Sequence, residues 1–466
     1  MIDSDLVSIT EGKTKILIPS ISLKSKVATK REPVFFNFAA EFNRDISVIA
    51  YSSFLSNSNF GDQNTKYKHK AIRNNITMAD SLCGTGARGL RVAVEVPEVN
   101  QIYFNDVNPV AIDVAKKSAV INHVEDKCHF SVNEVCKFLL GGIDEITTSS
   151  TCNTQNKKSM TTGQRFTIVD LDPFGSPASY VDCVTRSVED GGLISVTATD
   201  TAVLCGKYPD VCLRKYYGRP LNNSYTNETA LRILISLVAL TSARLGICIY
   251  PLFAHSNMHY LRLYARVILS SSLANGVFEN IGYLRHCFEC GNRTVSSTQN
   301  LAQVCELCAG TFATAGWLWT GKIYDKVFVR EMIAKTSSAS RDGNNKANDT
   351  VVEEVDENIK INRDESKAHD NDINENTMSK REPIRKTKSQ KMLQRLFSRC
   401  LSEHDDIPYY FTSDEIASKL KMSPPSLDKV VESLSKAGFR TSQTGLNPTA
   451  FKTEAKINEI MTIFRK

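Results

Sequence analysis

Short apolar runs alternate with longer runs of helical spacing through the first part of the chain. The runs that predict strands are residues 75–83, 102–107, 166–175 and 193–200. The runs that predict helices are residues 89–96, 109–123 and 178–192. Strands that alternate with helices indicate a parallel sheet with crossover helices, so this part predicts an α/β fold. Ligands of such sheets bind at the carboxyl ends of the strands.

A polar segment separates this part from the C-terminal region. Residues 336–391 contain no Phe, Tyr or Trp and are dense in Asn, Asp, Glu, Lys and Ser. Such a segment buries too little apolar surface to offset its ordering entropy, so it predicts a disordered linker. Beyond it, residues 412–422 and 423–439 predict two helices that precede a short extended stretch. This order predicts a winged-helix-like unit, which could bind nucleic acid or protein.

A glycine-rich loop follows the first of these strands. It reads Gly84-Thr85-Gly86-Ala87-Arg88-Gly89, and Asp106 follows near the end of the next strand. The glycines let the backbone approach a nucleotide, and the acid can accept hydrogen bonds from ribose hydroxyls. The pattern fits the dinucleotide loop of dehydrogenases, the nucleoside loop of S-adenosylmethionine-dependent methyltransferases, or a tight turn without a ligand.

The segment Asp172-Pro173-Phe174 ends the third predicted strand. The amino group of a purine is a poor nucleophile because its lone pair is delocalised into the ring. A carboxylate and a backbone carbonyl can accept its hydrogens and orient it towards a methyl donor. Phe174 can stack on a base. The segment therefore favours amino methylation over hydride transfer, the alternative being that Asp172 only caps the next helix.

Several motifs now resemble one known family, the tRNA guanine-26 N2-methyltransferases that form N2,N2-dimethylguanosine. The similar segments, in order, are residues 9–19, 33–37, 41–47, 83–91, 170–177, 196–209, 317–325 and 423–439. Of these, DLDPFGSP (170–177) and TATDTAVLCG (197–206) are the most specific. The resemblance implies transfer of methyl groups from S-adenosylmethionine to the N2 atom of guanine 26 in tRNA.

The resemblance also implies roles for residues. It puts Arg44 near the cofactor carboxylate, Arg88 at the methionine portion and Asp106 at the ribose. Glu134 and Val135 would lie beside the adenine. The full implied cofactor set is Phe35, Arg44, Asp80, Gly84, Gly86, Arg88, Asp106, Glu134 and Val135. The implied catalytic set is Asp172, Pro173 and Phe174, with Phe35 and Phe174 as stacking residues.

Four of the 13 cysteines form two C-x2-C pairs, Cys287/Cys290 and Cys305/Cys308. Two such pairs at this spacing can converge on one tetrahedral zinc ion. Four thiolates leave no open coordination position, so the zinc would be structural; two disulfides or free thiols are the alternatives. The other cysteines are scattered in apolar surroundings and are expected to be buried thiols in a reducing compartment.

The expected architecture is an α/β protein in four parts. Residues 1–245 form the N-terminal segment and a Rossmann-like methyltransferase domain with a mainly parallel sheet. Residues 246–335 form the zinc-knuckle part of a smaller α+β C-terminal region, residues 336–391 the linker, and residues 392–466 the winged-helix-like tail.

The charge of the chain indicates which class of partner to expect. The net charge is +6, and since residues 341–375 are acidic, the remainder is more basic still. A polyanionic partner such as tRNA fits this balance. Basic residues interleaved with Tyr could contact RNA or form a solvated face; they include Lys207, Lys215, Arg219, Arg262 and Arg266, with Tyr208, Tyr216 and Tyr217.

The sequence also bears on membrane association and on the compartment of the protein. No run approaches the ~20 apolar residues of a membrane span. The N-terminus carries no apolar signal core, so an intracellular protein is expected. The basic cluster at residues 380–391 could be a nuclear import signal or solvated linker. The nucleus is expected first, with the cytoplasm and mitochondrion open.

Two alternatives to the guanine-26 enzyme stay open at this point. One is an amino-methyltransferase that acts on another RNA or DNA site. The other is a non-catalytic RNA-binding protein on the same scaffold, although such a protein has no need for a carboxylate at Asp172. Oligomeric state is not predicted.

Overall fold

The computed structural model describes residues 6–23, 34, 36–56, 75–148, 165–257, 259–297, 303–341 and 375–465. For residues 142–148, 338–341 and 375–388 only the course of the backbone is described. Within the described residues, no helix is both long and apolar enough to cross a bilayer.

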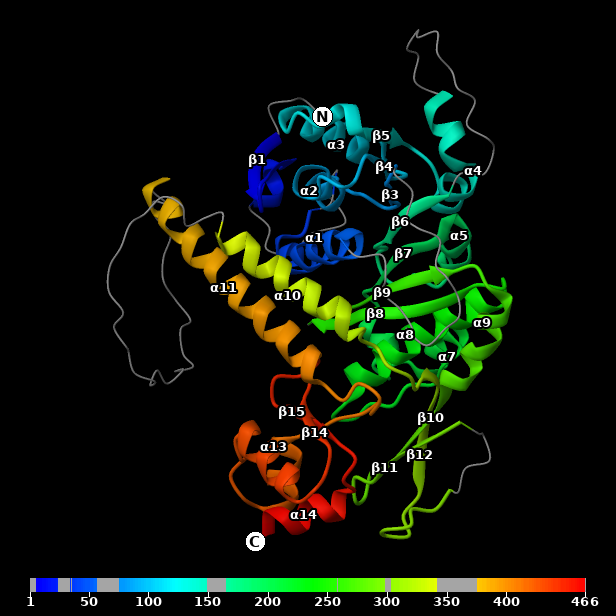
Figure 1. Ribbon diagram of the computed structural model, residues 1–466, viewed down its shortest axis with the longest axis vertical. Helices are drawn as coiled ribbons and strands as arrows, with labels where there is room; N and C mark the ends of the chain where they lie inside the picture. The colour runs from blue at the N-terminus through cyan, green and yellow to red at the C-terminus, as the bar shows by residue number, and fades with distance from the viewer. Residues whose placement is uncertain are drawn as a thin grey trace.

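A seven-stranded sheet forms the centre of the larger part of the molecule (Figure 1). Its strands in spatial order are β5 (Cys128–Ser131), β4 (Gln101–Asn105), β3 (Thr77–Asp80), β6 (Phe166–Leu171), β7 (Val188–Ala198), β9 (Tyr260–Ile268) and β8 (Cys248–Asn257). The pairs from β5 to β7 are parallel, and β9 is antiparallel to both β7 and β8. The mainly parallel sheet predicted from the sequence is therefore confirmed. All six residues of β6 are buried, as expected for a strand covered on both faces.

Helices surround this sheet and an N-terminal hairpin closes one end. The helices are α1 (Glu41–Ser56), α2 (Ala87–Glu95), α3 (Pro109–Ile121), α4 (Val135–Thr148), α5 (Val181–Ser187), α6 (Thr201–Leu204), α7 (Pro209–Tyr216), α8 (Thr226–Ala243) and α9 (Ser271–Asn275). The hairpin strands are β1 (Leu6–Glu11) and β2 (Thr14–Pro19). Asn108 caps α3, and Pro109 starts that helix, because proline fits a first turn that needs no N–H donor. The helix predicted over 178–192 ends earlier, since Val188 already begins β7.

The C-terminal region contains two small sheets and two long helices. The elements are β10 (Ile281–Cys287), β11 (Arg293–Ser296), β12 (Phe312–Trp319), α10 (Lys326–Arg341), α11 (Glu375–Ser402), β13 (Phe411–Thr412), α12 (Ser413–Leu420), α13 (Leu427–Lys436), β14 (Thr441–Gln443), β15 (Ala450–Thr453) and α14 (Ile457–Arg465). The two helices predicted for the winged-helix-like tail are present as α12 and α13, followed by β14 and β15. The helices α10 and α11 lie side by side and lead from the region of α1 towards this tail (Figure 1).

Three expectations from the sequence need correction. The first domain does not end at 245, because β8 and β9 complete the central sheet. The predicted linker is helical at both of its ends: α10 continues to Arg341 and α11 starts at Glu375. Ser389 of α11 donates a hydrogen bond to Asp45 of α1 (3.1 Å), so tertiary contact offsets the polar composition there. Residues 342–374 lie outside the described residues.

The third correction concerns cysteine chemistry. Cys136 of α4 and Cys183 of α5 form a disulfide, whereas both were expected as free thiols. Packing of the two helices brings their Cα atoms to 5.4 Å, within the range that a disulfide spans. Their separation of 47 positions in the sequence gave no sign of this pairing.

Candidate active site

Acidic residues gather at the carboxyl edge of three neighbouring strands. Asp80 ends β3, Asp106 follows β4, and Asp172 follows β6. The parallel register sets Asp80 beside Asp170, the penultimate residue of β6. The carboxyl ends of these adjacent parallel strands therefore lie at the same edge of the sheet. The loops that follow them form the candidate active site.

The glycine loop has the backbone shape that its sequence suggests. Gly84 and Gly86 have φ angles of +53° and +78°, a region that favours glycine. A Cβ at Gly86 would lie 2.9 Å from the Cβ of Ala115 in α3, so the loop packs too closely for a side chain. The Gly84 N–H donates to Asp106 (2.9 Å), and the other Asp106 oxygen accepts from Asn108 N–H (2.9 Å). This fixes the acid at the mouth of the loop.

Asp172 contacts Arg88 and caps no helix. An N–H of the Arg88 guanidinium donates to the Asp172 carboxylate, whose side chain is 28% exposed. The next helix, α5, has Tyr180 as its N-cap, so the capping alternative for Asp172 is excluded. Phe174 is 76% exposed beside it. The result is a half-buried carboxylate next to an aromatic ring at the protein surface.

The turn after Asp172 is hydrogen-bonded to Thr199, which belongs to the motif TATDTAVLCG (197–206). Gly175 N–H donates to the Thr199 hydroxyl (2.6 Å), and Thr199 N–H donates to the Gly175 carbonyl (2.9 Å). Gly175 has φ +83°, which an L side chain rarely adopts. Two hydrogen bonds therefore join the segments 170–177 and 197–206 beside Asp172.

A buried charge cluster lies directly beneath. Arg262 of β9 donates to Asp170, and so does the hydroxyl of Tyr51 from α1. The Arg88 Nε atom lies 3.3 Å from the same carboxylate. Burial alone would raise the pKa of Asp170, but the two guanidinium groups outweigh it and hold this pKa below its ordinary value. The cluster thus keeps a carboxylate charged without solvent.

Sequence reasoning missed the part of Arg262 in this cluster. Arg262 and Arg266 were expected on a basic surface, but both side chains are fully buried, as is Tyr216. The available signal was the apolar run around Arg262 in residues 260–268, which suits a central strand better than a surface. Tyr208 and Tyr217 are exposed, in line with the expected basic and aromatic face.

The remaining predicted cofactor residues differ in surroundings. Arg44 makes a two-pronged ion pair with buried Glu11 (2.7 and 2.6 Å). Asp80 accepts from Gly89 N–H (3.0 Å), and burial together with the charge of Asp170 raises its pKa to about 7. Glu134 is exposed and Val135 is buried at the start of α4. Phe35 lies outside the described residues.

The four predicted metal ligands come together. The sulfur atoms of Cys287, Cys290, Cys305 and Cys308 all lie within 4.8 Å of one another. The Cys287–Cys308 sulfur distance is 3.5 Å and the Cys290–Cys305 distance is 3.6 Å, too long for disulfide bonds. In a tetrahedral zinc site with four thiolates the sulfur atoms are about 3.8 Å apart. The donor set and spacing therefore fit a zinc ion.

Comparison with known proteins identifies the family. The family described as N2,N2-dimethylguanosine tRNA methyltransferase matches residues 12–366 and 365–465. The chain belongs to this family. A relative from Methanothermobacter thermautotrophicus named tRNA (guanine(26)-N(2))-dimethyltransferase is 33% identical and covers 98% of this chain and 97% of its own length. The resemblance inferred from the motifs is thus confirmed.

Further relatives show how far the similarity extends. A protein from Aquifex aeolicus named tRNA (guanine(26)-N(2)/guanine(27)-N(2))-dimethyltransferase is 32% identical over 69% of this chain and 73% of its own. The structure of Trm1 from Pyrococcus horikoshii with S-adenosyl-L-methionine shares the fold, with a TM-score of 0.70, 22% identity and coverage of 98% and 99%.

Proposed function

We propose that this protein transfers methyl groups from S-adenosylmethionine to the N2 atom of guanine 26 in tRNA, giving N2-methyl- and N2,N2-dimethylguanosine. The observation that carries the proposal is the position of Asp172. It is a half-buried carboxylate at the carboxyl end of β6, beside the glycine loop, in a chain of this family. Bound S-adenosylmethionine would supply an electrophilic methyl carbon.

Asp172 acts on the amino group of the base. The carboxylate oxygen that does not contact Arg88 would accept an N2–H hydrogen bond, and the Pro173 carbonyl is the candidate second acceptor. Two acceptors localise the nitrogen lone pair and aim it in one direction. After transfer, the nitrogen gives up a proton to Asp172 or through solvent. Phe174, exposed at this edge, stacks on the guanine.

Arg88 connects the two halves of the proposed site. It belongs to the glycine-rich motif, lies in the first turn of α2 and contacts Asp172. We assign it to the methionine end of the cofactor and to fixing the Asp172 carboxylate.

The other cofactor residues are assigned to the ribose and the adenine. Asp106 would accept hydrogen bonds from the ribose hydroxyls, and Glu134 and Val135 would lie beside the adenine. Arg44 would support this pocket through its ion pair with Glu11, and Asp80 through the hydrogen bond that it accepts from Gly89 N–H. Phe35 is proposed as a stacking residue.

The four-cysteine cluster is proposed to hold one structural zinc ion. Cys287 and Cys305 are buried, and Asn292 donates to the Cys305 sulfur (3.5 Å). A hydrogen bond of this kind stabilises a thiolate and orients it as a ligand. The metal would pin the ends of β10 and the loop before β12, far from the methyl-transfer chemistry in sequence.

The experiment compares wild-type protein with Asp172→Ala and with the matched control Asp113→Asn, an exposed acid paired with Lys117. Methyl transfer to an unmodified tRNA transcript and tRNA affinity are measured together. Loss of at least 10²-fold in rate for Asp172→Ala with unchanged affinity supports the proposal. A wild-type protein that binds tRNA without methylating it would favour the non-catalytic alternative. Label at another base would keep the chemistry and refute the position.

The compartment belongs to the proposal as well. We assign the protein to the nucleus on the basis of the basic residues 380–391. Imaging of a fluorescent fusion before and after neutralisation of that cluster tests the assignment, and unchanged distribution refutes it.

A further inference from the structure

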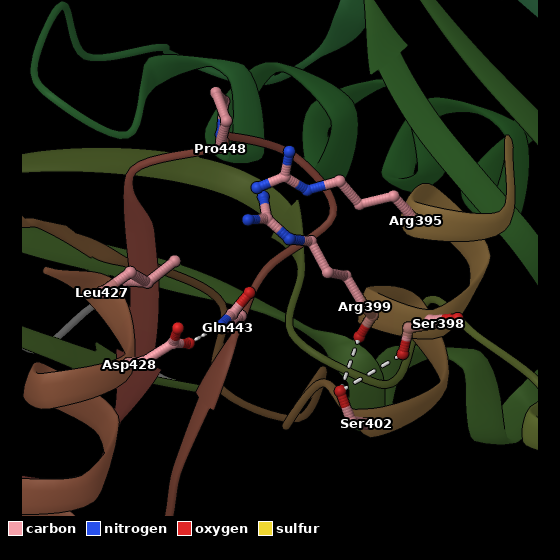
Figure 2. Close-up of a pocket in the computed structure, with 8 residues that line it drawn as sticks. All are labelled: Arg395, Ser398, Arg399, Ser402, Leu427, Asp428, Gln443 and Pro448. Atoms are coloured by element: carbon pink, nitrogen blue, oxygen red, sulfur yellow. Dashed lines mark hydrogen bonds between the residues drawn. The ribbon is translucent and has the colours of Figure 1, made fainter. Parts of the chain in front are cut away.

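A cavity of about 430 Å³ lies where α11 meets the winged-helix-like tail. Arg395 and Arg399 enter it from α11, and the first turn of α13 and the segment around Gln443 close the other side (Figure 2). None of its lining residues belongs to the proposed methyl-transfer site around Asp172. The methyl-transfer site therefore does not account for this cavity.

The two arginines place two positive charges beside each other in the lining of the cavity. They are four positions apart on one helix face, and their guanidinium groups lie together over the cavity (Figure 2). Like charges at this spacing repel each other. Within the described part of the chain, no carboxylate lies within ion-pair distance of either guanidinium, although the Asp428 charge acts on Arg399 from farther away. Partial burial and the charge of Arg395 lower the pKa of Arg399 despite the opposing charge of Asp428, so an anion between the two guanidinium groups would stabilise the charged form of Arg399.

The rest of the lining limits what the anion can be. Asp428 carries the opposing charge, but one of its oxygens already accepts from the Gln443 amide (2.7 Å). Leu427 and Pro448 provide the apolar surface, and among the described residues no aromatic ring lines the cavity to stack on a base. The first turn of α13 adds the positive end of a helix dipole. Two guanidinium groups and the N-terminus of a helix can both bind a phosphate group. Because the lining offers no ring for a base to stack on, the site suits a phosphate without a base beside it.

We propose that Arg395 and Arg399 bind a backbone phosphate of the tRNA at the junction of α11 and the winged-helix-like tail. This inference rests on the proposed function, because it takes tRNA as the polyanion. An RNA phosphate is favoured over a free nucleotide because the site lacks a place for a base. Since α11 also packs against α10, a phosphate held here would fix the RNA relative to both parts of the protein.

The test uses the full chain with Arg395→Gln and Arg399→Gln combined. Affinity for unmodified tRNA is measured from 50 to 400 mM salt, with kcat and KM for methyl transfer. Losing one phosphate contact should weaken binding about fivefold near 0.1 M salt and reduce the slope of log affinity against log salt by about 0.7. The KM for tRNA should rise while kcat at saturating tRNA and S-adenosylmethionine affinity stay within about twofold.

Two comparisons keep the outcome decisive. The control removes two guanidinium charges elsewhere, by Arg186→Gln with Arg244→Gln, both of which pair with Asp182. It should leave the salt slope unchanged. Arg395→Lys combined with Arg399→Lys should restore most of the slope but not the full affinity, since lysine lacks the planar fork.

Other results would overturn the inference. Unchanged tRNA affinity in the Arg395→Gln, Arg399→Gln protein refutes it while leaving the proposed function intact. Equal loss in the Arg186→Gln, Arg244→Gln control shows a general charge effect and also refutes it. If inorganic phosphate raises the Tm of wild type but not of the double variant, with equal tRNA affinity, the site takes a small anion instead.

Discussion

The Arg88 guanidinium and the Asp172 carboxylate are hydrogen-bonded partners, although 84 positions separate them in the sequence. The same guanidinium lies 3.3 Å from Asp170 through its Nε atom. One side chain thus joins the buried cluster under the sheet edge to the carboxylate at the surface. The reactive acid is held by the fold and does not sit on a free loop.

Replacing Arg88 should therefore affect chemistry more than folding. We expect Arg88→Ala to lower kcat by about 10²-fold, because Asp172 loses the donor that fixes it. Asp170 keeps Arg262 and Tyr51 as partners, so the core retains a compensated charge. Methyl-transfer assays at saturating tRNA and S-adenosylmethionine measure the loss in kcat, and the Tm of the variant measures the effect on folding. A variant with wild-type kcat would show that the contact is dispensable.

Lys452 provides a buried electrostatic link between the tail and the central domain. Its Nζ atom lies 2.8 Å from Glu228 of α8 and 2.9 Å from Glu403, and all three side chains are fully buried. Lys452→Met would leave these carboxylates without that cation, so we expect a loss of about 3–5 kcal/mol in unfolding free energy. Urea unfolding measures this loss.

The matched control for that experiment is Lys436→Met. Lys436 forms an exposed pair with Glu432 on α13, and exposed pairs contribute about 0–1 kcal/mol. A loss for Lys452→Met no larger than for Lys436→Met would contradict the assigned link.

Zinc content tests the cysteine cluster. We expect about one zinc ion per chain by elemental analysis, and loss of that ion together with a lower Tm in Cys305→Ser. Cys128→Ser, which changes a buried thiol outside the cluster, should keep its metal. Metal-free wild-type protein with an unchanged Tm would refute a structural zinc.

The raised pKa of Asp80 predicts that its contribution to the stability of the folded protein decreases as the pH rises. An unfolded Asp ionises near pH 3.9, whereas folded Asp80 holds its proton to about pH 7 because of burial and the nearby Asp170 charge. Its stabilising contribution is complete below pH 4 and is lost as pH rises to about 7. Asp80→Asn removes this loss, so its Tm relative to wild type should rise between pH 5 and 7.5. A constant difference across that range would contradict the assignment.

Local motifs predicted the chemistry, and long-range packing supplied what they could not. The glycine loop, Asp172 and the four cysteines each lie within a short segment whose residue types dictate their use. The strand that carries Arg262 was assigned to a different domain because it enters the central sheet antiparallel and late in the chain. The pairing of Arg262 with Tyr51 joins residues from β9 and α1, and no local pattern links them.

The predicted linker also shows that composition does not reveal contacts between distant segments. Composition alone predicted disorder up to 391, but the contact between Ser389 and Asp45 depends on how α11 lies against α1. The cavity beside Arg399 likewise exists only where α11 and the tail meet. Such features depend on tertiary packing and are absent from composition.

The most direct test of the account is methyl transfer from labelled S-adenosylmethionine to an unmodified tRNA transcript, followed by nucleoside analysis and position mapping. The account predicts N2-methyl- and N2,N2-dimethylguanosine at position 26, and no product from a transcript with adenine at that position. Equal labelling of both transcripts, or no labelling of a transcript that the protein binds, would contradict it.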